Sequence, residues 1–188
     1  MRMLDFKAQS TVYQKTKFTL TSMSALIKTN PLLPGLYLAA YALAFHKAYP
    51  EHIDGEALGE MTDLLAASDI MKKLYEGKDF FSEKNISSRA TMAKEPAELY
   101  PENWKYDFHV DMDKRECFMN YHSCAICNMC KREGCFDLLK YMCKIDFVSQ
   151  DLMGNTLIRT KTLAEGYDGA IQCTVPAGRC GSVALSRR

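Results

Sequence analysis

The stretch from Lys105 to His122 limits the fold more than any other part of the sequence, because it reads as two strands joined by a polar turn. In KYDFHVD, the side chains of Tyr106, Phe108 and Val110 alternate with polar ones, which is the period of a half-buried strand. Residues 116–122 alternate again after the turn sequence DMDK. The two segments therefore predict a β-hairpin.

The part of the chain before residue 101 has helical rather than alternating periodicity. Apolar residues recur at helical spacing in four segments, and we predict helices over 8–28, 35–49, 55–76 and 86–98. Asp54 is the expected N-cap of the third helix. The apolar run Gly35 to Phe45 is about half of the roughly 20 residues that a membrane-spanning helix needs. We therefore expect a buried core helix there, and no membrane association.

After the hairpin we predict two helices and then two strands, over 124–133, 136–152, 156–163 and 170–175. The sum is an α+β fold, in which N-terminal helices pack with a C-terminal antiparallel sheet that has two helices inserted between its hairpins. We expect one domain over residues 1–188. It is mainly helical over 1–100, mixed over 101–178 and ends in a tail over 179–188.

The net charge and the cysteine content limit the kinds of partner and the cellular compartment that we expect for this protein. The formal net charge is +1 and no Lys/Arg cluster stands out, so the phosphate-binding energy of a nucleic-acid-binding protein has no evident source. The eight cysteines are too few for a disulfide-stapled secreted scaffold, and the first residues lack an apolar signal region. We expect a cytoplasmic protein with reduced thiols and no nucleic-acid partner, and a homo-oligomer is one option for its assembly.

Four cysteines crowd the segment SCAICNMCKREGC, at positions 124, 127, 130 and 135. The first three share a broad face of the predicted helix, where free cysteines commonly pack as small hydrophobes. A second interpretation gives Cys124 or Cys127 a nucleophilic or site role. A third is an iron–sulfur or zinc site, although the fourth spacing differs from the ferredoxin run. The sequence leaves all three open.

Two histidines lie on the predicted hairpin. His109 and His122 are on its two strands and Asp107 lies near the first of them. A histidine beside a carboxylate is a usable general base, because its pKa is close to neutral pH. Exposed strand faces also carry such residues without any catalytic role.

The segment from residue 104 to residue 169 resembles the family of L-2-amino-thiazoline-4-carboxylic acid hydrolases. The resemblance rests on an ordered set of motifs: a cysteine between strand and helix, a glycine, Cys-x-x-Asp, Arg-Thr-x-Thr and a Gly-rich turn. Here these are Cys124, Gly134, Cys143 with Asp146, Arg159-Thr160 with Thr162, and Gly166. After the turn the family has Cys-Asp-Phe, whereas this chain has Gly-Ala-Ile-Gln at 169–172 and its next cysteine, Cys173, comes three positions late.

The resemblance implies a hydrolase that opens the ring of a cyclic amidine bearing a carboxylate, yielding N-carbamoyl-L-cysteine, without a cofactor. Such a site needs an anion clamp, a proton donor and either an activated water or a covalent nucleophile. We expect Arg159 to clamp the carboxylate, with Thr160, Thr162, Cys127 and Cys143 around the substrate.

For the chemical step the candidates are Cys124, Asp146, His122 and His109. Cys124 is the first choice as nucleophile, since the start of a helix lowers a thiol pKa. Asp146 could act as acid or base, or simply pair with Arg159. Thr160 and Thr162 lie on the strand face opposite Arg159, so all three reach one ligand only if the strand bends. The altered C-terminal motif also admits a non-catalytic binding or sensor member of the family.

Overall fold

The computed structural model describes residues 32–95 and 102–178. The first described part contains four helices: α2 (Leu33–Ala48), α3 (Gly55–Ala67), α4 (Asp69–Tyr75) and α5 (Glu83–Ala93). A hairpin and a group of helices follow: β1 (Lys105–Asp111), β2 (Glu116–Ser123), α6 (Ala125–Arg132), η1 (Phe136–Leu138), α7 (Leu139–Met142) and α8 (Lys144–Leu152). The chain then forms β3 (Asn155–Lys161), η2 (Leu163–Glu165) and β4 (Ala170–Pro176). The predicted helix over 8–28 lies outside the described residues.

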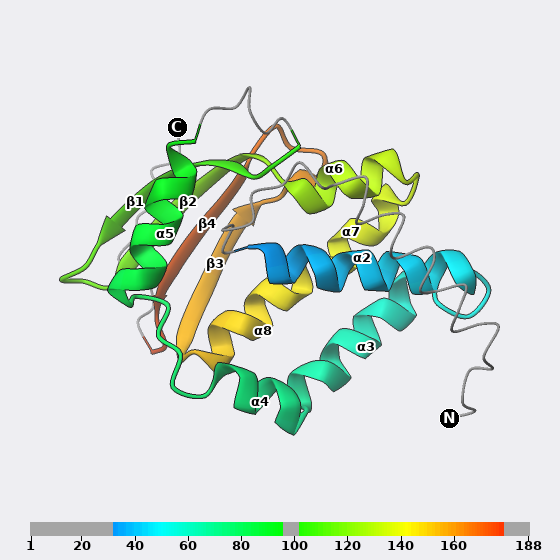
Figure 1. Ribbon diagram of the computed structural model, residues 1–188, viewed down its shortest axis with the longest axis horizontal. Helices are drawn as coiled ribbons and strands as arrows, with labels where there is room; N and C mark the ends of the chain where they lie inside the picture. The colour runs from blue at the N-terminus through cyan, green and yellow to red at the C-terminus, as the bar shows by residue number, and fades with distance from the viewer. Residues whose placement is uncertain (1–31, 96–101, 179–188) are drawn as a thin grey trace.

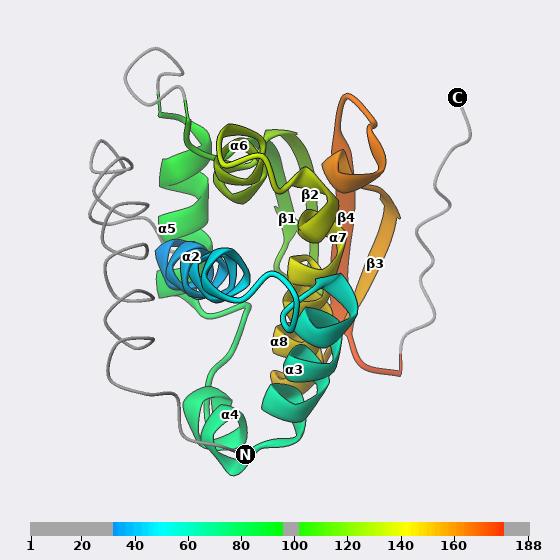
Figure 2. The ribbon, with the colours of Figure 1, turned by 90° about the vertical axis from the view of Figure 1, so that its right-hand side faces the viewer.

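The strands form one four-stranded sheet in the order β1-β2-β4-β3, and every pair in it is antiparallel. The helices α6 to α8 stand between β2 and β3 in the chain, and the described helices gather on one face of the sheet (Figures 1 and 2). The predicted α+β fold with helices inserted between its hairpins is confirmed.

The core lies between this sheet face and the helices. One side of α2 supplies Leu36, Ala40 and Leu43, each at most 1% exposed, and Pro34 fits at the start of this helix because its missing N–H would have no partner there. The buried side chains of β1 and β2 include Tyr106 and Met119, which belong to the same cluster. The alternation seen in the sequence thus marks the sheet face that packs against the helices.

Two of the predicted helices are broken. The predicted helix over 55–76 is two helices, because Ser68 is in an extended conformation and caps α4 by accepting a hydrogen bond from the Met71 amide. Asp54 caps α3 as predicted, accepting from the Ala57 amide at 2.9 Å. The predicted helix over 136–152 is divided into η1, α7 and α8, with Cys143 between the last two. The third strand ends at Lys161, earlier than predicted.

Two glycines set how closely α3 approaches α7. A Cβ at Gly55 would come within 3.0 Å of three ring atoms of Tyr141, and one at Gly59 would lie 3.3 Å from the same ring. The absence of a side chain at these positions lets the Tyr141 ring lie against the helix. Within the described residues, no helix combines the length and apolar character that crossing a bilayer requires.

Candidate functional site

An open cleft of about 640 Å³ lies between α3, the α7–α8 region and the end of β3. Figure 1 shows α8 beside β3, the edge strand of the sheet, and α3 on the other side of α8. The lining residues are mostly polar or charged: Glu56, Gly59, Glu60, Asp63, Lys140, Tyr141, Cys143, Lys144, Phe147, Arg159, Thr160, Thr162, Ala164 and Glu165. Both the size and the shape suit a small ligand.

The two helical walls of the cleft carry opposite charges. Glu56, Glu60 and Asp63 come from α3 at spacings that place them on one face of the helix. Lys140 and Lys144 come from the α7–α8 wall, and the Lys144 ammonium lies 2.5 Å from the Asp63 carboxylate. The α3 wall is therefore anionic and the α7–α8 wall cationic, with Asp63 and Lys144 paired between them, and Glu165 of η2 adds a carboxylate beside Thr162.

Arg159 is the most buried cation of the cleft, with a side chain only 5% exposed. Its Nη2 donates to Asp146 Oδ2 at 2.5 Å and its Nη1 donates to the Cys143 carbonyl at 3.2 Å. The guanidinium also stacks on the Phe147 ring, 4.8 Å from the ring centroid. The half-exposed Asp146 is thus the carboxylate that pairs with Arg159, which is one of the roles that the sequence left open for it.

A β-bulge explains how Arg159 and its neighbours share the cleft. Arg159 pairs with Gln172 on β4, but the next pair joins Lys161 to Ile171, so Thr160 is an extra residue on β3. A bulge bends a strand and redirects its side chains. Arg159, Thr160 and Thr162 consequently all line the cleft, which strict alternation would prevent. Thr162 also caps η2, accepting from the Glu165 amide.

Cys124 is at the start of α6 as expected, but the pKa of its thiol is not lowered. Burial raises this pKa to about 11, and this effect outweighs the hydrogen bonds from the Cys127 and Ile126 amides at the helix start. Burial likewise raises the pKa of Cys143 to about 12, with the nearby Asp146 charge adding to the effect. Thiols with such pKa values are protonated at neutral pH, and at Cys124 burial opposes the lowering that a helix start favours.

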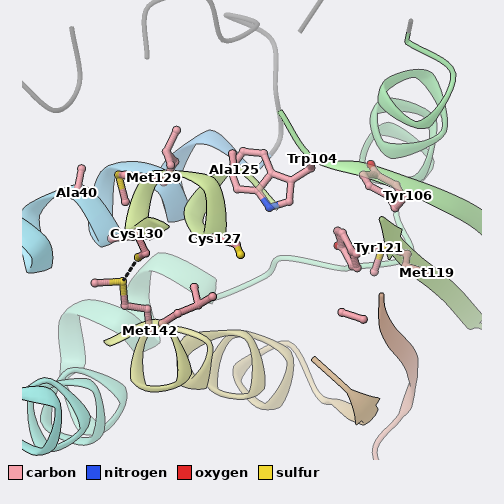
Figure 3. Close-up of a cluster of buried hydrophobic side chains, with 14 of the residues drawn as sticks. Ala40, Trp104, Tyr106, Met119, Tyr121, Ala125, Cys127, Met129, Cys130 and Met142 are labelled. Carbon is pink, nitrogen blue, oxygen red and sulfur yellow. Dashed lines mark hydrogen bonds between the residues drawn. The ribbon is translucent and has the colours of Figure 1, made fainter. Parts of the chain in front are cut away.

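The other cysteines of α6 belong to the hydrophobic core. Cys127 and Cys130 are at most 2% exposed, and Figure 3 shows them among Ala125, Met129 and Met142. The Cys130 thiol points to the Met142 sulfur at 3.7 Å. No group of three or more His, Cys, Asp or Glu side chains in residues 32–95 and 102–178 is arranged to hold a metal ion. The burial of Cys127 and Cys130 in the core favours the interpretation that these two thiols pack as small hydrophobic groups.

The hairpin histidines lie away from the cleft. His122 Nε2 is 2.9 Å from Asp107 Oδ2, and both side chains are more than half exposed. The bond from His122 is the main reason that the pKa of Asp107 is lowered. His109 pairs with Phe118 across β1 and β2, on the side of the strands away from the core residues Tyr106 and Met119. Neither histidine lines the cleft.

Of the residues expected around a substrate, Arg159, Thr160, Thr162 and Cys143 line the cleft and Asp146 contacts one of them, whereas Cys124 and Cys127 do not line it. The sequence analysis did not predict the acidic row of α3, which consists of Glu56, Glu60 and Asp63. Its spacing is visible in the sequence, but the same spacing is typical of any solvated helix face.

The fold is that of an α+β protein with an open, charged cleft between α3, the α7–α8 region and β3. A family model described as L-2-amino-thiazoline-4-carboxylic acid hydrolase matches residues 35–173, and the chain belongs to this family. The suspected family is therefore confirmed, over a longer segment than the motifs alone covered. Comparison with curated proteins and with solved structures gives no significant match.

Proposed function

We propose that this protein is a hydrolase that opens the ring of L-2-amino-thiazoline-4-carboxylate, or of a close cyclic relative, in the cleft between α3, α7–α8 and β3. The observation that carries the proposal is the Arg159 guanidinium, which is nearly buried yet lines an open cleft in a chain of this family. A planar guanidinium is well suited to bind a carboxylate.

The charges of the cleft match the two ends of such a substrate. The substrate carboxylate binds on the side of Arg159 and Lys140, and the protonated amidine lies toward the acidic row of α3. Opposite charges at the two ends fix the direction in which the ring enters, because the reversed direction places like charges together. Thr160 supplies a hydroxyl near the same end as Arg159.

The ring opens by addition of water to the carbon between sulfur and nitrogen. The ring nitrogen of the protonated amidine already carries its hydrogen. The water oxygen becomes the urea oxygen, the carbon–sulfur bond breaks, one water proton ends on the departing sulfur and the other is released to solvent through the accepting carboxylate. A carboxylate must accept a proton from the water for this step. Since Asp63 is paired with Lys144, we assign that role to Glu56 or Glu60, which line the cleft from the same face of α3.

Attack by water accounts for the state of the thiols better than covalent attack does. The raised pKa of Cys124, about 11, leaves almost none of it as thiolate at neutral pH, and the thiolate is the nucleophilic form. In this mechanism Cys143 contributes a neutral wall to the cleft and Cys124 packs behind it.

The product carries a free thiol, which gives a direct assay. Purified protein is incubated with the thiazoline, new thiol is measured with a chromogenic disulfide, and N-carbamoyl-cysteine is identified by mass spectrometry. Turnover should be lost in Arg159→Gln and lowered at least about tenfold in one of the two variants Glu56→Gln and Glu60→Gln, while Cys124→Ala retains it. Arg132→Gln removes a cation that is paired with Glu102 on the surface, and it should leave turnover unchanged.

The outcomes separate the candidate functions. Binding of the thiazoline without turnover would favour a non-catalytic binding or sensor protein. Loss of turnover in Cys124→Ala, with folding intact, would favour the covalent route instead. Bound iron or zinc in protein purified without oxygen would favour the metal-binding alternative at the 124–135 cysteines.

The product of the proposed reaction indicates the metabolic role and the cellular compartment of the protein. A hydrolase forming a cysteine derivative acts in cysteine metabolism, and the seven free cysteines among the described residues fit the reducing cytoplasm. A homo-oligomer stays a prediction, which light scattering on the purified protein tests.

A further inference from the structure

Gln172 on β4 holds the edge of the Arg159 guanidinium that carboxylates commonly occupy. The two residues are directly paired across β3 and β4. With the amide oriented so that its oxygen faces the N–H donors, Gln172 accepts from Nη2 at 2.8 Å and from Nε at 3.2 Å. A neutral amide therefore stands where a second carboxylate would fit.

The charge balance around Arg159 depends on this neutral partner. Asp146 is the one carboxylate that an ion pair joins to Arg159 within residues 32–95 and 102–178, so the pair has no net charge. A carboxylate at position 172 would give the group one net negative charge. Because the Arg159 side chain is only 5% exposed, water would screen a charge that faces it poorly.

The hydrogen-bond count leaves the guanidinium with capacity for a ligand. A guanidinium has five N–H donors. Two on Nη2 go to Asp146 and Gln172, the one on Nε goes to Gln172, and one on Nη1 goes to the Cys143 carbonyl. Among the described residues, the second N–H of Nη1 has no such partner, and Arg159 lines the cleft.

We propose that Gln172 is a specificity-determining residue, which keeps Arg159 able to bind a carboxylate in the cleft by holding it with a neutral group. This inference rests on the proposed function, in that the cleft is taken to bind a carboxylate substrate. Gln172 acts through Arg159 and positions it. A carboxylate at position 172 converts the cleft from one that prefers anionic ligands into one that rejects them.

The test compares a charged and a neutral ligand. The two probes are L-2-amino-thiazoline-4-carboxylate and its 4-carboxamide, and binding is measured by isothermal titration calorimetry alongside kcat and KM. Gln172→Glu is nearly isosteric and adds one negative charge. It should weaken binding of the carboxylate roughly 10- to 100-fold and raise KM similarly, with the carboxamide affinity changed less than about threefold.

Two further variants separate charge from packing. Ser87→Glu adds the same charge on the exposed surface of α5, beside β1 at the other edge of the sheet, and should change neither affinity. Gln172→Met removes the acceptor without adding charge, and should weaken both ligands by a similar, small factor. It tests the proposal even if Gln172→Glu fails to fold, because a selective loss of carboxylate binding in Gln172→Met would contradict the charge argument.

Failure of this inference is distinct from failure of the hydrolase proposal. Equal weakening of both ligands in Gln172→Glu, or no weakening, overturns the role of Gln172 even where turnover is seen. Carboxylate binding that is selective but without turnover overturns the hydrolase and supports Gln172. A wild-type protein that binds neither ligand overturns both.

Discussion

The contact between Gly55 and Tyr141 gives a sharp test of the packing that shapes the cleft. In Gly55→Ala, the new Cβ would come within 3.0 Å of three atoms of the Tyr141 ring. Overpacking costs about 1–3 kcal/mol, and three close atoms place this case in the upper half of that range. Gly55 is the first residue of α3, where alanine gains less than the about 1 kcal/mol of a helix interior, so we expect a net loss of about 1–3 kcal/mol in the free energy of unfolding.

Urea denaturation measures this loss, and for a chain of this size Tm should fall by about 2–4 °C per kcal/mol. Gly35→Ala in α2 is the matched control, since nothing lies within 4 Å of its added Cβ, and it should gain about 0.5–1 kcal/mol. In a Tyr141→Ala background the cost of Gly55→Ala should disappear. If Gly55→Ala is as stabilising as Gly35→Ala, or if its cost persists without the ring, the reasoning is wrong. Because Tyr141 lines the cleft, Gly55→Ala should also raise KM.

Three further predictions concern a helix cap, a thiol and an ion pair. Asp54→Ala removes the acceptor for the Ala57 amide and should cost about 1 kcal/mol, measured by urea denaturation; no loss would mean that solvent caps α3 equally well. Burial raises the pKa of Cys130 to about 12, so iodoacetamide at pH 8 should label it only after unfolding, as peptide mass spectrometry can follow. The bond from Arg115 lowers the pKa of Asp79 below its ordinary value of 3.8, so its stabilising effect is present above that pH and is lost as pH falls through the folded-state pKa. The difference in urea midpoint between wild type and Asp79→Asn should therefore shrink between pH 6 and pH 2, and a constant difference would contradict the assignment.

The strands were predictable because their signal is local. The alternating segment Lys105–Asp111 has the same bounds as β1 in the structure, and the polar turn after it predicted the pairing with β2. The break at Ser68 was less visible, because Ser-Asp is compatible with both a helix interior and a new N-cap. No glycine or proline marks the break between α7 and α8 at Cys143. We attribute this break to packing between segments that are distant in the sequence, which overrides local helix propensity.

The candidate site was predictable only in part, because its residues come from segments that lie far apart in the sequence. The resemblance singled out Arg159 and Asp146, and side-chain geometry brought them together. The acidic row of α3 comes from a part of the chain about eighty residues before α8 in the sequence, so no local pattern could join it to the cleft. The thiol of Cys124 was placed correctly at a helix start, but its pKa follows burial, which spacing along a helix does not reveal.

The bulge at Thr160 has a consequence for the assembly of this protein as well as for its cleft. Strand β3 is at the edge of the sheet, and a regular edge strand offers unpaired backbone groups to any extended chain that meets it. The extra residue lies in the β3–β4 pairing near the end of β3, and a bulge at that place twists the free edge away from a regular strand. The same irregularity that turns Arg159 and Thr160 toward one cleft therefore shortens the edge on which a misfolded or partly synthesised copy could add a strand.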